Sequence, residues 1–263
     1  MTKLIATDLD GTLVGSDGRI SERTKAALLL VESKGVEVVF VTGRPLRWAE
    51  EVFSYVGTHG LAIVSNGALV WDVAMERPVL VRAIEPVIGL EVCELILSAV
   101  AGSSFAVETL AGLALEPEFV ERHPVPSGAR RGPIAEIFDA PAVKLLARHE
   151  QLPAQEFWDL AQAAAGDRVV ITWSSDSAML EISAAGVTKA STLALVCAGR
   201  GVVAEEVVAF GDMPNDIAML TWAGTSYAMA NAHPSVLAAA AAVTASNDDD
   251  GVAAVLERLA ASL

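Results

Sequence analysis

The chain has 263 residues, a formal net charge of −15 and hydrophobic residues at 53% of its positions. This hydrophobic content is typical of a packed globular protein, and the length allows one large domain or two smaller ones. The negative charge argues against nucleic acid or an anionic membrane as a partner, because both bind basic protein faces.

Targeting and metal–thiolate signals are missing from the sequence. Asp8 and Asp10 interrupt the N-terminal apolar run, which does not fit a signal peptide, and no apolar stretch approaches the length of a membrane span. Cys93 and Cys197 lie far apart in apolar helical contexts and are expected to be buried free thiols. The absence of Cys-x-x-Cys and His-Glu-x-x-His argues against zinc. We therefore expect a cytoplasmic protein.

The first third of the chain alternates strands and helices. An apolar run at residues 3–7 predicts a buried strand that stops at Asp8. Ser21 is placed to cap a helix that runs to about Lys34, with Gly35 as its stop. Further elements follow in order: strand 36–41, a helix opened by Pro45, strand 61–64, and an Asn66-Gly67 turn into strand 69–71. This order predicts a parallel sheet with helices on both faces.

The middle of the chain, residues 83–186, has a different pattern. Its expected elements are helix 87–100, strands 105–108 and 112–115, a Pro-, Gly- and Arg-rich loop at 123–133, strand 142–147, a helix after Pro153, and strands 168–173 and 178–182. Hairpin-like strands beside two helices predict an inserted α+β domain.

The α/β alternation returns from residue 187. The expected elements are helix 189–199, strand 207–210, helix 216–222, strand 225–229 and helices 234–243 and 251–261. We predict an α/β fold: a Rossmann-like, doubly wound parallel-sheet core formed by residues 1–82 and 187–263. Residues 83–186 would form an α+β cap domain inserted into it.

Two aspartates, Asp8 and Asp10, follow the first strand, and Gly11 lets the backbone turn sharply after them. Ligands of open parallel sheets bind at the carboxyl ends of the strands, and two crowded carboxylates repel each other unless a cation or a proton holds them. A capped strand end with solvated turn residues is the alternative. An EF-hand fits poorly, because the glycine comes three residues after the first aspartate instead of five.

Four polar clusters fall at strand ends or helix starts of the predicted core. They are Asp8 with Asp10, Thr42-Gly43-Arg44, Lys189, and Gly211-Asp212-Met213-Pro214-Asn215-Asp216. Taken singly, each has a structural explanation as a turn, a solvated lysine or a helix cap. Three of them follow predicted buried strands at the same end of the sheet, which favours a common site.

The ordered set resembles the haloacid dehalogenase superfamily of aspartate-nucleophile phosphohydrolases, and within it the Cof-type branch with a large α+β cap. The resemblance covers essentially the whole chain and includes the four clusters together with Ser65-Asn66-Gly67-Ala68, Gly186-Val187-Thr188-Lys189 and Asn247-Asp248-Asp249-Asp250-Gly251-Val252. One departure is Thr188-Lys189-Ala190, where the branch usually has Ser-Lys-Gly.

The resemblance implies a covalent mechanism. Asp8 would attack phosphorus to form an aspartyl-phosphate, and Asp10 would donate a proton to the leaving oxygen and later activate water. Thr42 and Lys189 would hold the phosphoryl oxygens. Gly43 would keep the backbone close to the phosphate.

The resemblance also implies Mg²⁺ and a substrate pocket. The metal ligands would be the Asp8 carboxylate, the Asp10 backbone carbonyl and the Asp212 carboxylate, with Asp216 acting directly, through water or behind the ligands. Arg44 would contact a distal anionic group of the substrate, and Asn215 would also bind substrate. For Arg130 and Arg131 the same contact is conceivable, but solvated loop arginines are the expected outcome.

The substrate implied is a small phosphorylated metabolite, with sugar phosphates foremost, and no nucleic acid or membrane partner is expected. A phosphotransferase or phosphomutase of the same superfamily is the first alternative. A non-catalytic phospho-aspartate module is the second, and it fits less well because such a module would be one small domain without a hundred-residue insertion. The sequence leaves the substrate and the oligomeric state open.

Overall fold

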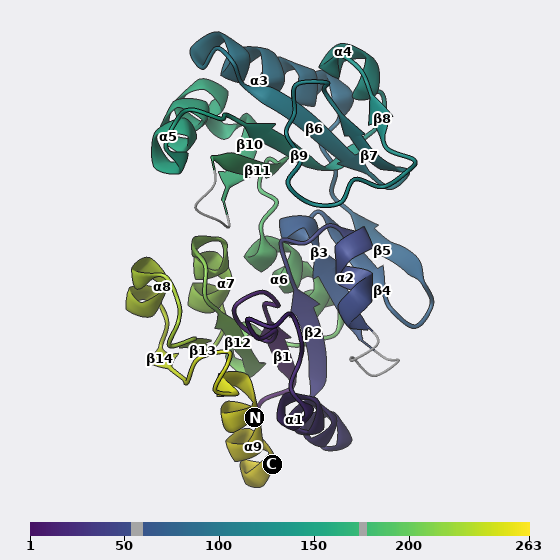
Figure 1. The fold of residues 1–263 in the computed structure, drawn as a ribbon. Coiled ribbons are helices and arrows are strands. Elements are labelled where there is room, and N and C mark those ends of the chain that lie inside the picture. The colour runs from purple at the N-terminus through teal and green to yellow at the C-terminus, as the bar shows by residue number, and fades with distance from the viewer. Residues whose placement is uncertain (54–59, 174–177) are drawn as a thin grey trace. The chain divides into compact units, whose positions relative to one another are not determined.

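The computed structural model describes residues 1–53, 60–173 and 178–263. Within these residues the chain divides into two compact units, Met1–Leu80 with Thr188–Leu263, and Val81–Val187. The first, the core unit, is an α/β fold around a mostly parallel sheet, and the second, the cap unit, is α+β (Figure 1). The predicted fold class is thereby confirmed.

The sheet of the core unit has the strand order β14-β13-β12-β1-β2-β3-β4-β5. Its strands are β1 (Leu4–Thr7), β2 (Glu37–Val41), β3 (Leu61–Val64), β4 (Leu69–Asp72), β5 (Arg77–Val81), β12 (Val207–Gly211), β13 (Thr225–Ala228) and β14 (Ala242–Val243). β1 lies between β12 and β2 and is parallel to both, with Leu4 paired to Val207 and to Glu37. The strand order reverses at β1, so its carboxyl end is the switch point where such sheets bind ligands.

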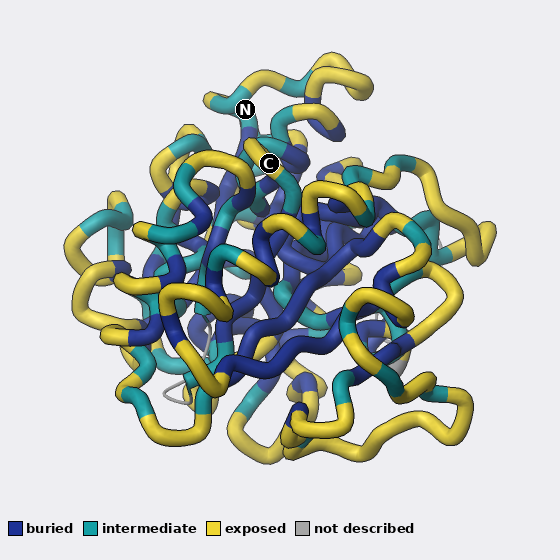
Figure 2. The backbone as a smooth tube through the Cα atoms, turned by 90° about the horizontal axis from the view of Figure 1, so that it is seen from above, coloured by how far each residue is buried: buried dark blue, intermediate teal, exposed yellow. Residues whose placement is uncertain are grey.

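The central strands consist almost entirely of buried residues. Every residue of β1, β3 and β12 is buried. Figure 2 shows buried backbone in dark blue, flanked by exposed loops in yellow. Strands covered on both faces need uninterrupted apolar sequence, which explains the runs Leu4–Thr7 and Val207–Gly211. These buried central strands are a rigid support for the side chains that follow their carboxyl ends.

Helices and single turns complete the core unit. The α-helices are α1 (Glu22–Ser33), α2 (Leu46–Phe53), α6 (Lys189–Gly199), α7 (Ile217–Trp222), α8 (Pro234–Ala239) and α9 (Gly251–Ser262). The 3₁₀ turns are Ser65–Gly67, Ala204–Glu206 and Pro214–Asp216. α1 starts at the predicted cap, because the side chain of Ser21 accepts a hydrogen bond from the backbone of Thr24. α1 and α9 lie side by side (Figure 1), and Arg23 donates two hydrogen bonds to Glu257 at 2.9 and 2.7 Å.

The cap unit has a second sheet with the order β10-β11-β9-β6-β7-β8. Its strands are β6 (Ser104–Thr109), β7 (Gly112–Leu115), β8 (Arg130–Arg131), β9 (Ala142–Arg148), β10 (Val169–Thr172) and β11 (Met179–Ala184), and its helical segments are α3 (Pro86–Ala99), α4 (Ile134–Ile137), α5 (Ala154–Ala165) and the turn Gly166–Arg168. α3 and α5 pack on one face of this sheet, where Val92 and Phe157 share a buried apolar cluster with Phe105 and Leu145.

Several short elements differ from the sequence prediction. β5 is an additional, largely exposed strand, and β8 and α4 lie in and just after the predicted loop at 123–133. The predicted helix 234–243 divides into α8 and the two-residue strand β14, and α7 begins at Ile217, one residue later than expected. Such short edge strands form because a neighbouring strand offers hydrogen bonds, which leaves no periodic signal in their own sequence.

Both cysteines are free and buried, as predicted. No helix in the described part of the chain combines the length and the apolar character needed to cross a membrane.

Candidate active site

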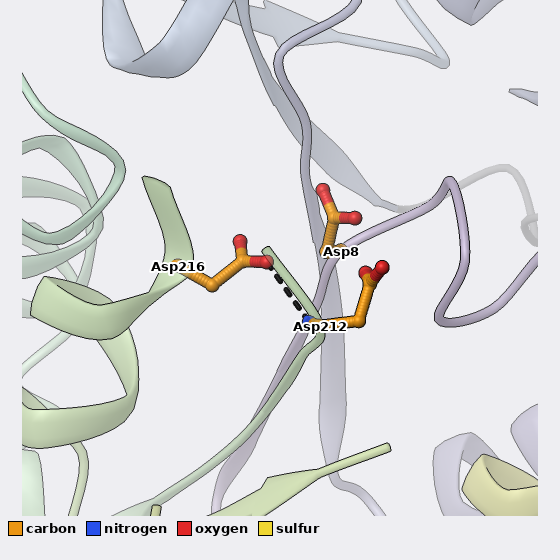
Figure 3. Close-up of side chains that lie close together, drawn as sticks. All are labelled: Asp8, Asp212 and Asp216. Atoms are coloured by element: carbon orange, nitrogen blue, oxygen red, sulfur yellow. Dashed lines mark hydrogen bonds between the residues drawn. The ribbon is translucent and has the colours of Figure 1, made fainter. Parts of the chain in front are cut away.

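Three aspartates from two distant segments of the core unit converge at the carboxyl ends of β1 and β12 (Figure 3). Asp8 directly follows β1, Asp212 directly follows β12, and Asp216 ends the turn Pro214–Asp216. One carboxylate oxygen from each lies within 4.8 Å of the others, and all three residues are buried. Buried carboxylates at this spacing could hold a hard cation.

Both carboxylate oxygens of Asp216 accept hydrogen bonds from neighbouring residues of the site. Oδ2 accepts hydrogen bonds from the backbone N–H groups of Asp212 and Met213, each at 3.0 Å. Oδ1 accepts one from Lys189 Nζ at 2.6 Å. Gly211 is required for this approach, because a Cβ atom there would lie 2.5 Å from the Cβ of Asp216. Since its oxygens are already engaged, Asp216 is better placed to orient its neighbours than to coordinate a cation directly.

Lys189 is the first residue of α6 and is almost fully buried. The helix start is fixed by Thr188, whose side chain accepts from the backbone of Ser191. An ammonium group at a helix N-terminus is disfavoured by the helix dipole. Two carboxylates offset this cost, because Nζ donates to Asp8 Oδ1 at 2.7 Å as well as to Asp216.

Burial and mutual repulsion govern the charges of this cluster. Burial raises the pKa of Asp8, and the negative charges of Asp216 and Asp212 raise it further, while Lys189 acts in the opposite direction. Burial likewise raises the pKa of Asp212 to about 6, with Asp216 adding to the shift. Burial disfavours the ammonium of Lys189, but the attraction of Asp216 and Asp8 outweighs it and raises its pKa. The three carboxylates therefore exceed the positive charge that faces them.

Thr12, which was assigned no role from the sequence, and Gly11, the predicted turn residue, shape the site. Thr12 Oγ1 donates to Asp212 Oδ1 at 2.7 Å and so links the two strand ends. Gly11 has φ +72°, and a Cβ atom there would lie 2.3 Å from Asp212 Oδ2. The only signal for Thr12 was its place in the turn after Asp8.

Asp10 and Arg44 pair with each other beside the buried cluster. Arg44 Nε donates to Asp10 Oδ2 at 2.7 Å, and Nη2 donates to Oδ1 at 2.5 Å. The side chain of Asp10 is 58% exposed, and its carboxylate is not among the cluster that the described residues form. Arg44, expected at a distal anionic group, therefore contacts the proposed acid/base residue.

The turn after β2 is bound to the turn after β3. Thr42 Oγ1 accepts from the backbone N–H of Arg44 at 3.0 Å, with Gly43 between them. The backbone N–H of Asn66 donates to the carbonyl of Thr42 at 3.1 Å, and that of Ser65 donates to the carbonyl of Arg44 at 2.9 Å. Ser65 and Asn66 both have positive φ, of 51° and 55°. This strained turn fixes the position of Thr42.

Asn215 reaches the same turn, since its Nδ2 donates to Asn66 Oδ1 at 3.1 Å. The Oδ1 atom of Asn215 and the hydroxyl of Ser65 are buried and have no hydrogen-bond partner among the described residues. Buried polar atoms of this kind usually bond to a ligand or an ordered water. The structure thus brings Asp8, Thr42, Lys189, Asp212, Asn215 and Asp216 into one region of the core unit.

Comparison with known proteins gives consistent matches over nearly the whole chain. A family model described as haloacid dehalogenase-like hydrolase matches residues 5–256. The 5-amino-6-(5-phospho-D-ribitylamino)uracil phosphatase YcsE of Bacillus subtilis is 31% identical over 255 residues, covering 95% of this chain and 93% of the relative. The phosphoglycolate phosphatase of Methanopyrus kandleri is 27% identical over 259 residues, covering 98% and 97%.

Solved structures agree with this result. SMU.1108c from Streptococcus mutans UA159 superposes with a TM-score of 0.87 at 25% identity, over 99% of this chain and 100% of the other. BT1666 from Bacteroides thetaiotaomicron, described among phosphatases of the haloalkanoate enzyme superfamily, gives a TM-score of 0.83 at 25% identity, over 98% and 95%.

Proposed function

The chain belongs to the haloacid dehalogenase-like hydrolases and is a phosphatase of the Cof-type branch, and we propose that it hydrolyses small phosphorylated metabolites, sugar phosphates foremost, with Mg²⁺ and an aspartyl-phosphate intermediate. The observation that carries the proposal is the meeting of Asp8, Asp212 and Asp216 with Lys189 at the switch point of the core sheet. The substrate class is supported by two relatives, whose names specify a phosphorylated ribitylamino-uracil and phosphoglycolate.

The donor set fits magnesium. It consists of carboxylate oxygens, which Mg²⁺ prefers, and it contains no nitrogen or sulfur ligand among the described residues. Burial and the neighbouring carboxylates raise the pKa of Asp8 and Asp212, and a bound cation would offset that cost. Asp8, Asp212 and the backbone carbonyl of Asp10 would hold the ion, with Asp216 behind them. When bound, the ion would supply positive charge that draws the phosphate anion to the Asp8 carboxylate.

Asp8 acts as the nucleophile in the proposed first step. Its carboxylate oxygen forms a bond to phosphorus while the bond from phosphorus to the ester oxygen breaks, and Asp10 gives that oxygen its proton. In the second step Asp10 takes a proton from water, the water oxygen attacks phosphorus, and Asp8 leaves as a carboxylate. The products are the alcohol and inorganic phosphate, and Asp10 regains in the second step the proton that it gave in the first.

Lys189 and Thr42 hold the phosphoryl oxygens in this scheme. The ammonium of Lys189 lies 2.7 Å from Asp8 Oδ1, so a phosphoryl group attached to Asp8 would be next to it. Thr42 Oγ1 accepts from the backbone of Arg44, which leaves its hydroxyl proton for an oxygen of the substrate. Losing one such donor typically costs about 3 kcal/mol of transition-state stabilisation.

A panel of phosphorylated metabolites tests the proposal. With Mg²⁺, the wild-type protein should release inorganic phosphate from several sugar phosphates, and EDTA should abolish the release until Mg²⁺ is added back. Asp8→Asn should fold normally, because its side-chain oxygen can still accept from Lys189, and should release no phosphate. Phosphate release by that variant, or equal turnover in EDTA, would contradict the scheme.

Asp10→Asn separates the two steps. We expect it to slow both, and if phosphorylation is less affected than hydrolysis, intact-protein mass spectrometry will detect the phosphorylated enzyme. A second alcohol in the assay distinguishes hydrolysis from transfer, because a phosphotransferase or phosphomutase would pass the phosphoryl group to it instead of releasing inorganic phosphate.

A further inference from the structure

The loop between β1 and α1, residues 8–21, accepts hydrogen bonds from the side chains of two asparagines in the C-terminal third of the chain. Asn231 Nδ2 donates to the carbonyl of Gly11 at 2.8 Å. Asn247 Nδ2 donates to the carbonyl of Val14 at 2.9 Å. Both bonds end on backbone oxygens of the turn that carries Asp8 and Asp10, and neither asparagine belongs to the buried acidic cluster.

The two asparagines are also bonded to each other. The backbone N–H of Asn247 donates to Asn231 Oδ1 at 3.0 Å. Both ends of the Asn231 amide are therefore engaged, and its orientation is fixed, since the oxygen must face the N–H and the NH₂ group must face Gly11. We call this linked pair, Asn231 and Asn247, the amide clamp.

The amide clamp connects the loop after β1 with the loop after β12. Asn231 lies in a segment whose backbone is bonded to the end of β12: Met229 N–H donates to the carbonyl of Gly211 at 3.2 Å, and His233 N–H donates to that of Asp212 at 2.9 Å. The segment thus holds the two strand ends that present the carboxylates of the proposed metal site. The side chain of Asn231 then joins this segment to the loop after β1 through its hydrogen bond to Gly11.

The other side of the clamp is anchored on α9. Asn247 lies in a turn closed by the N–H of Gly251, which donates to the carbonyl of Ser246 at 2.9 Å. A Cβ atom at position 251 would lie 2.1 Å from the carbonyl oxygen of Ala245, so the turn requires glycine. The first turns of α9 are buried in the core unit, which makes this anchor rigid.

We propose that Asn231 and Asn247 are positioning residues of the site, which set its affinity for Mg²⁺ without contacting the ion or the substrate. This inference rests on the proposed function. The carbonyl of Asp10, a proposed metal ligand, and the carbonyl of Gly11 belong to consecutive peptide units of one turn. Holding the second in place restricts the first, so less conformational entropy is lost when the ion binds.

The two asparagines contribute different numbers of side-chain hydrogen bonds, so the two alanine variants should differ in the size of their effect. Asn231→Ala removes the bond to Gly11 and leaves the N–H of Asn247 unpaired. Asn247→Ala removes only the bond to Val14, because its backbone N–H still reaches Asn231. We therefore expect the first variant to weaken Mg²⁺ binding by about tenfold and the second by less, in line with the loss of groups that orient metal ligands.

The experiment is isothermal titration calorimetry with MgCl₂ on the full chain without substrate, followed by kcat/KM at several Mg²⁺ concentrations. Asp249→Ala is the matched control: Asp249 lies in the same turn, its carboxylate bonds to Ser246 at 2.6 Å, and no contact with the loop 8–21 is found for it among the described residues. The control should bind Mg²⁺ like the wild type. In both clamp variants the lost turnover should largely return at saturating Mg²⁺.

Two outcomes would overturn the inference. If both clamp variants melt at lower temperature in EDTA but bind Mg²⁺ with wild-type affinity, the asparagines are structural only. If Mg²⁺ affinity falls equally in the control, the effect does not belong to the clamp. Failure of the proposed function looks different, since the wild type itself would then neither bind Mg²⁺ nor release phosphate, and the inference would fall with it.

Discussion

Arg44 forms a bidentate ion pair with Asp10, in which Nε and Nη2 donate to the two carboxylate oxygens at 2.7 and 2.5 Å. A planar guanidinium that meets a carboxylate in this way fixes its orientation as well as its charge. The sequence suggested instead that Arg44 binds a distal anionic group of the substrate. The two roles have different kinetic consequences.

For Arg44→Gln we expect kcat to fall about tenfold, because positioned acid–base groups contribute about 10²–10⁴ to rates and only part of that is lost when the group is less well placed. KM should change little for an aryl phosphate. Steady-state kinetics with an aryl phosphate and with phosphoglycolate, which has a second anionic group, distinguish the roles. A rise in KM confined to phosphoglycolate would favour the distal-anion role, and Arg44→Lys should recover only part of kcat if the paired geometry matters.

Lys189→Met should destabilise the metal-free protein by about 3–5 kcal/mol, because it leaves Asp8 and Asp216 buried without a counter-charge. Added Mg²⁺ should restore part of the loss. Urea unfolding in EDTA and in MgCl₂ measures both effects. Lys3→Met is the matched control: Lys3 pairs with Glu206 at 2.8 Å but its side chain is 54% exposed, so about 1 kcal/mol or less is expected. Equal losses for the two variants would contradict the charge balance described for the cluster.

The raised pKa of Asp212 predicts how metal-free stability depends on pH. A carboxyl group whose pKa is about 6 in the folded protein and about 4 when unfolded contributes stability below pH 4, which is lost as the pH rises to 6. Asp212→Asn cannot ionise, so its free energy of unfolding relative to wild type should increase over this interval, by up to about 3 kcal/mol. Chemical denaturation in EDTA at pH 4, 5, 6 and 7 provides the test. A difference that is flat with pH would mean that Asp212 does not titrate as described.

The two thiols should resist modification in the folded protein. Burial raises the pKa of Cys197 to about 11, with Arg200 opposing the shift, and burial also raises the pKa of Cys93. Because the thiolate is the reactive form, a disulfide reagent at pH 8 should react far more slowly with the native chain than with the chain in guanidinium chloride. Single serine variants assign each thiol. Rapid labelling of the native protein would show that one of them is accessible.

The sequence predicts most accurately the positions of residues that directly follow a strand or begin a helix. Asp8 and Asp212 follow apolar runs that are unmistakable strands, and parallel strands bring their carboxyl ends to one edge, so their proximity follows from the fold. Lys189 begins a helix whose range was predicted without error. The roles proposed for these residues remain predictions that rest on the family resemblance.

The residues that the sequence could not place depend on side-chain direction. Whether Arg44 turns towards Asp10 or towards solvent is a rotamer choice that neighbouring residues in the sequence do not determine. Thr12 and Asn231 are single polar residues in turns, where no periodicity separates a bonded side chain from a solvated one. β14, a strand of two residues, is defined by its pairing with β13 alone.

The pairing of Leu4 with Val207 has a consequence for the nascent chain. β1 is synthesised about two hundred residues before β12, so the edge of β1 that pairs with β12 stays open until β12 emerges. Chaperones that shield exposed strand edges would therefore have to protect, over this interval, the strand that leads to Asp8, the proposed nucleophile.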